Sequence, residues 1–274
     1  MNDTATALVN QSRPRILPYR VVAARAAITL LCVVVSAAAV VPFFSMGADP
    51  KRPSTGLRMP STHDMFLHYD QMKSFWNGIS SGEIYPRWEE DTNRGFGAPT
   101  TSFYPPGVYY ITSALYAIVH DWMKVLLLLH LLMMIASAAG LYIYARQVMS
   151  RFSAAIAMSI YAIAPYHLLD QYQRGAIAEL LGFVWMPLIL LFLDRLLAGA
   201  PKGEASATRG RGLGAIAGLA VCYGAFLWSH PPTAYQFTMV LVVYAALRVL
   251  LSKNWKGLLK AGGAGLWALG LSAA

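Results

Sequence analysis

The sequence has little charge and almost no cysteine. Only 13% of its 274 residues are charged, whereas an ordinary soluble domain is nearer a quarter. Its two cysteines, Cys32 and Cys222, both lie in apolar runs and form no disulfide framework, so we expect them to be packing residues. The sequence also has no phosphate-binding glycine loop, no zinc-type Cys/His spacing and no tandem repeat. These absences argue against a disulfide-rich secreted domain, a P-loop nucleotide-binding domain and a zinc module.

Long apolar runs account for most of what is present. The chain is 57% hydrophobic and its mean hydropathy is +0.46. Apolar runs of about 18 residues recur, and each is long enough to cross a ~30 Å hydrocarbon layer as a helix. The sequence therefore predicts an all-α polytopic membrane protein whose partner is the lipid bilayer. We expect about seven transmembrane helices, at Ala26–Phe44, Val125–Ala145, Phe152–Leu169, Leu180–Leu197, Leu213–Ser229, Thr233–Leu251 and Leu258–Leu271. Met133 and Met134 are expected to be core residues.

The first apolar run follows a basic tail. Small residues at Ser36–Ala39 would suit a signal-peptide cleavage site. Apolar residues nevertheless continue to Phe44, which favours an uncleaved anchor, with cleavage as the alternative. The basic residues of the tail are Arg13, Arg15, Arg20 and Arg25.

The distribution of Lys and Arg predicts the orientation in the membrane. Gly107–Val119 is Tyr-rich and too short to span, so we expect it to lie in the interface. With the N-terminus inside, 14 of the 22 Lys and Arg residues fall in cytoplasmic segments. This orientation accounts for the net charge of +9 without a nucleic-acid partner. We therefore expect a multi-pass protein of the plasma membrane with a cytoplasmic N-terminus.

This topology divides the chain into four parts. Residues 1–25 form a cytoplasmic basic tail, 26–44 the first transmembrane helix, 45–122 an extracytoplasmic loop with amphipathic and interfacial helices, and 125–274 a six-helix region. Gly199–Gly212 is rich in Gly, Ala and Ser and is expected to be a flexible connector. The chain stops inside an apolar run, which is how a truncated half of a longer protein would end.

The extracytoplasmic loop carries most of the polar chemistry. A stripe of apolar residues at helical spacing predicts an amphipathic helix over Met65–Ile79, lying on the membrane surface; the stripe is Met65, Tyr69, Met72, Trp76 and Ile79. Asp64 and His68 are one turn apart, so their side chains can meet. The structural alternatives stay open: Asp64 or Thr62 as a helix cap, and His68 as a residue of the polar face.

Other polar residues on the outer side are candidates for binding. Arg87 and Arg94 could hold a phosphate, or they could meet lipid headgroups or nearby acids. Asp170 and Arg174 are spaced for a mutual ion pair. His230, before two prolines, could simply mark a helix end. Glu89, Glu90 and Asp91 are expected to be a solvated run of charge.

Several stretches resemble one family of bacterial membrane proteins. They are His63-Asp64 with His68, "GEIYPRW" from Gly82, "GFGAP" from Gly95 with "FYPPGVYY" ending at Tyr110, "APYHLLDQYQRGAIAELLGFVWMPL" from Ala164, and "SHPPTAY" from Ser229. In this order they resemble the integral membrane proteins labelled 6-pyruvoyl-tetrahydropterin synthase-related, over about two thirds of the chain. This family is in turn similar to the GT-C membrane glycosyltransferases.

The resemblance implies transfer of a sugar from a polyprenyl-phosphate donor on the outer face. It implies Asp64 as the general base and Asp170 as a second outer acid. His68, one turn from Asp64, is the third expected catalytic residue. The expected substrate-binding residues are His63, Arg87, Arg94, Arg174, Glu179 and His230. His63-Asp64 replaces the paired acids of better-known members, so the use of a divalent metal stays open. The alternatives are a transporter, flippase or assembly scaffold for lipid-linked glycans, or a relative without activity.

Overall fold

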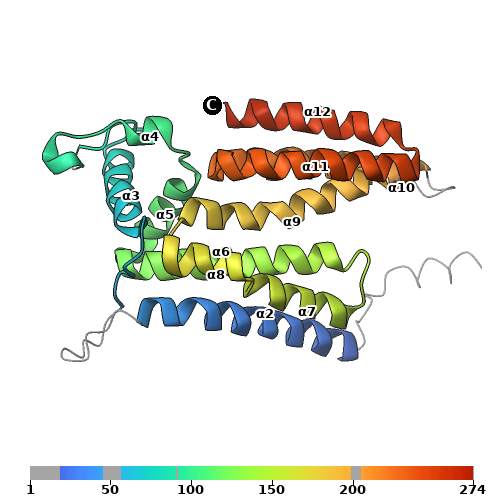
Figure 1. Cartoon of the computed structure of the whole chain (residues 1–274), viewed down its shortest axis with the longest axis horizontal. Coiled ribbons are helices and arrows are strands. Elements are labelled where there is room, and N and C mark those ends of the chain that lie inside the picture. The colour runs from blue at the N-terminus through green and yellow to red at the C-terminus, as the bar shows by residue number, and fades with distance from the viewer. Residues whose placement is uncertain (1–18, 46–56, 91, 199–204, 274) are drawn as a thin grey trace, which may run out of the picture.

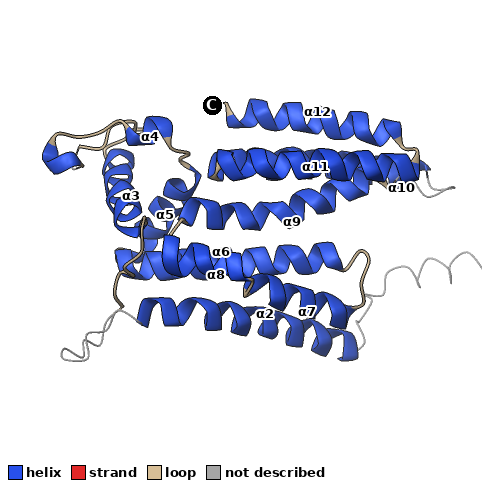
Figure 2. Cartoon of the chain, viewed as in Figure 1, coloured by secondary structure: helices blue, strands red, loops and turns tan. Residues whose placement is uncertain are grey.

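The computed structural model describes residues 19–45, 57–90, 92–198 and 205–273. Throughout these residues the regular elements are helices, as Figure 2 shows, so the all-α prediction is confirmed. Along the chain they are α2 (Tyr19–Ser45), α3 (Met65–Ser80), η1 (Asn93–Gly95), α4 (Thr100–Phe103), α5 (Gly107–Val119), α6 (Trp122–Ala145), α7 (Arg151–Ala162), α8 (Pro165–Leu169), η2 (Asp170–Arg174), α9 (Ile177–Leu197), α10 (Ala205–Ser229), α11 (Pro231–Ser252) and α12 (Trp255–Ser272).

Six helical segments of the described chain are long and apolar enough to cross a membrane. They are Val21–Ser45, Trp122–Ala145, Arg151–Arg174, Ile177–Leu197, Gly212–Ser229 and Pro231–Ser252. The seventh expected span is present as α12 at the C-terminal side of the bundle (Figure 1), where it packs against α10. It is not among the six, because its lysines and glycines keep its mean hydropathy low. The structure thus confirms a multi-pass membrane protein. In the described residues, six of the seven expected spans are long and apolar enough to cross a membrane, and the seventh is the less apolar helix α12.

Two further expectations about helix bounds are corrected. The first helix begins at Tyr19, earlier than Ala26, because its arginines do not stop a helix. The segment expected to be a flexible connector is helical from Ala205 onward as the start of α10. The rest of that connector, the tail before Tyr19, and Asp91 lie outside the described residues.

The third predicted span is interrupted near its outer end. Helix α7 ends at Ala162, and Ala164 is extended with ψ 141° before Pro165 starts α8. A proline disfavours helical geometry in the residue before it and provides no N–H for the preceding turn. The chain then makes a π-helical turn, η2. This helical segment ends at Gly175, whose backbone is in the left-handed region with φ 68°. Instead of a straight helix end, the outer end of this span is therefore an irregular segment.

Helix α3 confirms the predicted helix over Met65–Ile79, but its apolar stripe faces protein. Met65 and Met72 are fully buried, and the stripe packs toward α5. Trp76 meets Tyr116 of α5 with ring centroids 5.2 Å apart. Two residues outside the stripe, Phe66 and Leu67, are exposed instead. The expectation that the stripe inserts into the outer leaflet is therefore wrong, since α5 covers it.

Helix α5 explains why the Tyr-rich segment does not need to span. Its 13 residues extend about 20 Å at 1.5 Å each, less than the ~30 Å of a bilayer core. It packs on α3 at the same end of the bundle (Figure 1), where Tyr116 stacks on Trp122 of α6 at 4.1 Å. Together α3, α4 and α5 form a helical cap over one end of the long helices.

Two apolar cores join at α9. One unites α2, α3, α5, α6 and α7 with the first half of α9 and includes Met133 and Met134; the other unites the second half of α9 with α10, α11 and α12. Cys32 and Cys222 are buried and free, as expected. At the end of the bundle away from the cap, Asp194 of α9 accepts from the Tyr244 hydroxyl at 2.8 Å and pairs with Arg248 at 3.0 Å, which ties α9 to α11.

Candidate functional site

The candidate site lies where the start of α3 meets η2. The backbone N–H of Asp64 donates to the carbonyl of Arg174 at 2.9 Å, and that of His63 donates to Gln173 at 3.1 Å. Gly175 lets the two segments approach this closely. It has a positive φ, and a Cβ there would lie 2.1 Å from the Thr62 hydroxyl oxygen, well inside van der Waals contact. Two segments far apart in sequence are thus joined through their backbones.

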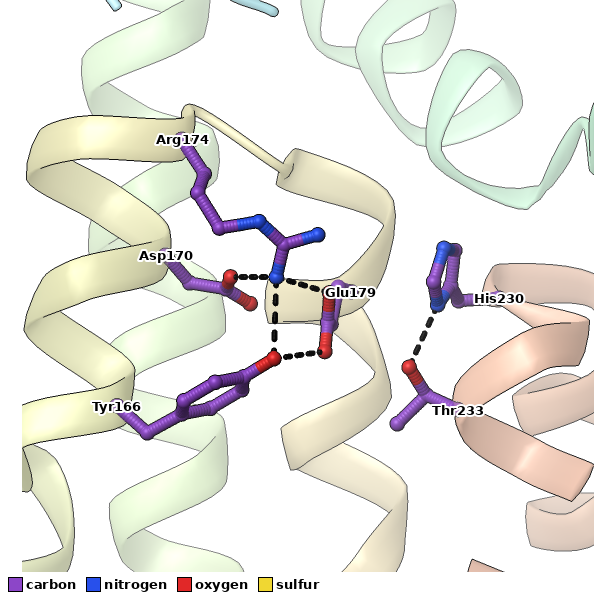
Figure 3. Close-up of polar contacts among 6 residues, drawn as sticks. All are labelled: Tyr166, Asp170, Arg174, Glu179, His230 and Thr233. Atoms are coloured by element: carbon purple, nitrogen blue, oxygen red, sulfur yellow. Dashed lines mark hydrogen bonds and ion pairs between the residues drawn. The ribbon is translucent and has the colours of Figure 1, made fainter. Parts of the chain in front are cut away.

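An ion network centred on Arg174 connects η2 to α9 (Figure 3). The Nη1 atom of Arg174 lies 2.5 Å from Oδ1 of Asp170 and 2.6 Å from Oε2 of Glu179. It also donates to the Tyr166 hydroxyl at 3.1 Å, and that hydroxyl donates to Oε1 of Glu179 at 3.0 Å. The predicted ion pair of Asp170 with Arg174 is therefore confirmed, with Glu179 as a second carboxylate that the i,i+4 spacing did not reveal.

Burial makes this network sensitive to the loss of any member. Asp170 is fully buried and Glu179 is 5% exposed, so each carboxylate needs a cation or donors to offset its desolvation. Within the described part of the chain, Oδ2 of Asp170 is buried without a hydrogen-bond partner. When both acids are ionised, they and the single guanidinium carry one net negative charge. Figure 3 shows Nη2 of Arg174 pointing away from both carboxylates, so this nitrogen of the guanidinium does not take part in binding the two acids.

Asp64 stands at the first position before α3 but does not cap the helix with its side chain. The Thr62 hydroxyl does so instead, because it accepts from the N–H of Met65 at 3.3 Å. Asp64 is half-buried and interacts electrostatically with Asp170. Its carboxylate is therefore near the network without being used for capping.

Tyr104 interacts electrostatically with these charged groups. Burial is the main cause that raises its pKa to about 12, and the negative charges of Asp64 and Glu179 add to the effect while Arg174 opposes it. The phenol consequently stays protonated at neutral pH and can donate a hydrogen bond. The sequence analysis did not single out this residue, because a tyrosine beside two prolines also fits a purely structural loop.

His68 is buried, not part of a polar face as its structural alternative assumed. It is 2% exposed, and burial lowers its pKa to about 4, although Asp64 raises it and His230 lowers it further. The imidazole bonds Tyr109 through Nδ1 at 3.2 Å and not Asp64. Because the Tyr109 hydroxyl donates to the Gln71 side-chain oxygen, it accepts from His68. The proton is therefore on Nδ1, and Nε2 carries the lone pair.

The two remaining histidines of the predicted site differ in burial. His63 is exposed. His230 lies in the turn between α10 and α11, as its helix-end alternative expected, with Nδ1 2.7 Å from the Thr233 hydroxyl. Burial lowers the pKa of His230, while Glu179 raises it and Arg174 lowers it. His230 thus feels the charges of the network without contacting it directly (Figure 3).

Two predicted phosphate-binding residues lie elsewhere. Arg87 and Arg94 are exposed on the segment between α3 and α4, which extends away from the bundle (Figure 1). The Arg87 guanidinium lies over the Tyr85 ring, 4.9 Å from its centroid. Arg94 has a left-handed backbone with φ 59° at a turn. Their role in the predicted site is not supported, since aromatic stacking and turn geometry account for their positions.

The predicted solvated acidic run is wrong at Glu89. This residue is 1% exposed, because its backbone pairs with Ala98 and turns the side chain inward. Burial raises its pKa. Glu90 is exposed as expected.

The donor set for a metal is small. In the described ranges, no three His, Cys, Asp or Glu side chains come together as a metal-binding group.

The candidate site as a whole consists of Asp64, His68, Asp170, Arg174, Glu179 and His230, with Tyr104, Tyr109 and Tyr166 added by the structure.

No family model matches the chain, and no curated protein matches it. The resemblance of its motifs to a GT-C-like family stays a prediction.

Proposed function

We propose that this protein transfers a sugar from a polyprenyl-phosphate donor to a hydroxyl acceptor at the capped end of the bundle, as a GT-C-type membrane glycosyltransferase. The observation that carries the proposal is the convergence of Asp64, Asp170 and Glu179 with Arg174 at the ends of membrane-spanning helices. A lipid-linked donor would reach such a site from the bilayer with its headgroup at that level.

In this proposal Asp64 is the general base. Transfer to a hydroxyl needs a carboxylate that can take the hydroxyl proton, which contributes about 10²–10⁴-fold to the rate. Asp64 suits the role because Thr62 supplies the helix cap and leaves the carboxylate uncommitted. His68, neutral with its lone pair on Nε2, could assist as a neighbouring acceptor.

Arg174 would stabilise the departing phosphate. Its contacts with the acids and Tyr166 are all made through Nη1, and its side chain is 36% exposed. Nη2 can therefore donate to a phosphate oxygen while Nη1 holds the carboxylates. A cation placed where negative charge develops lowers the barrier to the leaving group's departure.

The competing proposal is a transporter, flippase or scaffold without transfer activity. It is favoured by the way Arg174 pairs with two carboxylates inside the protein, which is also what a purely structural ion network would do. The two proposals differ in what Asp64 contributes, since a scaffold does not need a carboxylate that is left free of helix capping.

Replacing Asp64 by Asn tests the proposal. The full chain in lipid nanodiscs is given short-chain polyprenyl-phosphate hexoses with a radiolabelled sugar, and release of label to hydroxyl acceptors is measured. We expect Asp64→Asn to lower the rate about 10²–10⁴-fold with unchanged melting temperature. The matched control is Asp70→Asn, an exposed acid on the same helix, which should leave the rate unchanged. Unaltered transfer by Asp64→Asn, or no transfer by the wild type across the donor panel, would contradict the proposal.

A further inference from the structure

A small cavity lies inside the bundle beside α8 and η2, the segments that carry part of the network described above. Its volume is about 10 Å³, and it is lined by Leu180 of α9 and by side chains of α6, α8 and η2: His130, Met133, Met134, Ser137, His167 and Gln171. The α6 residues recur at intervals of three and four, so they share one helix face. A cavity of this size has room for one occupant about as large as a water molecule.

The two imidazoles have their tautomers set by backbone carbonyls. Nδ1 of His130 lies 2.8 Å from the carbonyl oxygen of Leu126, and Nδ1 of His167 lies 2.7 Å from that of Tyr161. A carbonyl oxygen only accepts, so Nδ1 carries the proton in both rings. In the neutral rings, Nε2 of each histidine therefore presents a lone pair.

The other two polar side chains around the cavity also donate to backbone carbonyls. The Gln171 amide nitrogen donates to the carbonyl of Ala39 at 2.9 Å, so its oxygen is the free end. The Ser137 hydroxyl donates to the carbonyl of Met134 at 3.0 Å, which leaves only its lone pairs. Apart from the second N–H of the Gln171 amide, the polar groups lining the cavity thus offer acceptors.

Two of these acceptors are buried without a partner in the described chain. They are Nε2 of His130 and Oε1 of Gln171, in residues that are 2% and 1% exposed. Buried polar atoms of this kind are rare in folded proteins and call for a partner. A water molecule could donate to both of these atoms, but it bonds only weakly to the thioether sulfurs of Met133 and Met134 that also line the cavity. A cation accepts electron pairs from every ligand around it.

We propose that this cavity binds a single Cu(I) ion. Imidazole nitrogens and the thioethers of Met133 and Met134 are soft donors of the kind that select Cu(I). All these ligands are neutral, and the Born cost of a buried ion grows with the square of its charge, which favours a monovalent over a divalent cation. Carbonyl bonds to Nδ1 orient metal-binding histidines in the same way in known sites.

Cu(I) titration of the full chain in detergent, under anaerobic reducing conditions and against a chromogenic Cu(I) chelator, measures the site directly. We expect one ion per chain, with X-ray absorption showing both nitrogen and sulfur neighbours. Met133→Leu with Met134→Leu keeps the side-chain volume and removes both sulfurs, so affinity should fall by about 10–100-fold. His130→Phe should lower it further.

The matched control is Met123→Leu, on the same helix but away from the cavity, which should bind as the wild type does. A melting temperature near the wild-type value for the double Met variant shows that the fold is kept. Absence of Cu(I) binding by the wild type, equal affinity in the Met variants, or a water molecule alone in the cavity after Cu(I) treatment would each overturn the proposal. None of these outcomes depends on glycosyl transfer.

Discussion

At the scale of single residues, burial decides which charged and titratable groups of this protein are available. Arg174 contacts two buried carboxylates through one nitrogen, so the same side chain can be both structural and functional. Glu89 shows the opposite case, because an acid expected in solvent is buried by a single backbone bridge. Neither outcome is encoded in residue type or in spacing along a helix.

His68 should make stability depend on pH. Its folded-state pKa of about 4 lies below the usual value near 6.5, so the unfolded chain binds the proton first. The stabilisation is complete above about pH 6.5 and is lost as pH falls toward 4. Between pH 7 and pH 5 the loss is roughly 2 kcal/mol.

Denaturation of the purified protein in detergent at these two pH values measures this loss. His68→Asn places a side-chain amide near the position of the imidazole Nδ1, and this amide does not take up a proton in this pH range. The decrease in unfolding free energy from pH 7 to pH 5 should therefore be smaller than in the wild type by roughly 2 kcal/mol. The exposed His63 provides the control, since His63→Asn should leave the drop unchanged. An equal drop in the wild type and in His68→Asn would show that His68 is not held neutral.

At the scale of elements, the interrupted third span is what assembles the candidate site. A straight helix over Phe152–Leu169 would leave Asp170 and Arg174 on a helix end. The break at Pro165 and the π-helical turn η2 instead bring this pair against the start of α9 and the chain before α3. The proline was visible in the sequence, but the π-helical turn was not, because no residue pattern specifies it.

Gly175→Ala should separate α3 from η2. Alanine is strained at φ 68°, which costs about 1–2 kcal/mol, and its Cβ would meet the Thr62 hydroxyl at 2.1 Å, which adds about 1–3 kcal/mol of overpacking. We expect a loss of about 2–5 kcal/mol in unfolding free energy, measured by chemical denaturation in detergent micelles. Amide exchange should also become faster at the backbone N–H of Asp64.

Gly95→Ala is the matched control for this change. Gly95 also has a positive φ, 86°, but a Cβ there would meet nothing within 4 Å. Its loss should stay near the 1–2 kcal/mol of backbone strain alone. Equal losses at Gly175 and Gly95 would mean that contact with Thr62 does not hold the two segments together.

At the scale of the whole molecule, the helices segregate polar chemistry to the two ends of the bundle. The cap of α3, α4 and α5 lies at one end (Figure 1), and the α6–α7 and α11–α12 turns with their Lys and Arg residues lie at the other. Because basic segments are retained on the cytoplasmic side, we predict that the capped end faces outward.

Thiol labelling tests this orientation. Gln147→Cys, in the exposed α6–α7 turn, should react with an impermeant maleimide only after the cells are permeabilised. Ser80→Cys, exposed at the end of α3, should react in intact cells. Native Cys32 and Cys222 are buried and should give little background. The reverse labelling pattern would invert the topology.

The sequence alone was enough to determine the class of fold and the approximate place of most helices. Long apolar runs such as Val125–Ala145 form helices in a bilayer because their backbone must satisfy its own hydrogen bonds there. Gly107–Val119 was correctly predicted to be too short to span. These properties depend on the composition of many neighbouring residues, so they can be predicted from each segment without knowing how the rest of the chain packs.

Tertiary structure decided which side chains meet and which are buried. It placed Glu179 beside Arg174, turned the stripe of α3 onto α5, buried His68 against Tyr109, and left Arg87 and Arg94 outside the site. Each outcome depends on contacts between segments distant in sequence, and on a left-handed glycine and a π-helical turn that no periodicity reveals. Desolvation and close approach exist only once the helices have packed, which is why the chemistry of this protein is settled at that level.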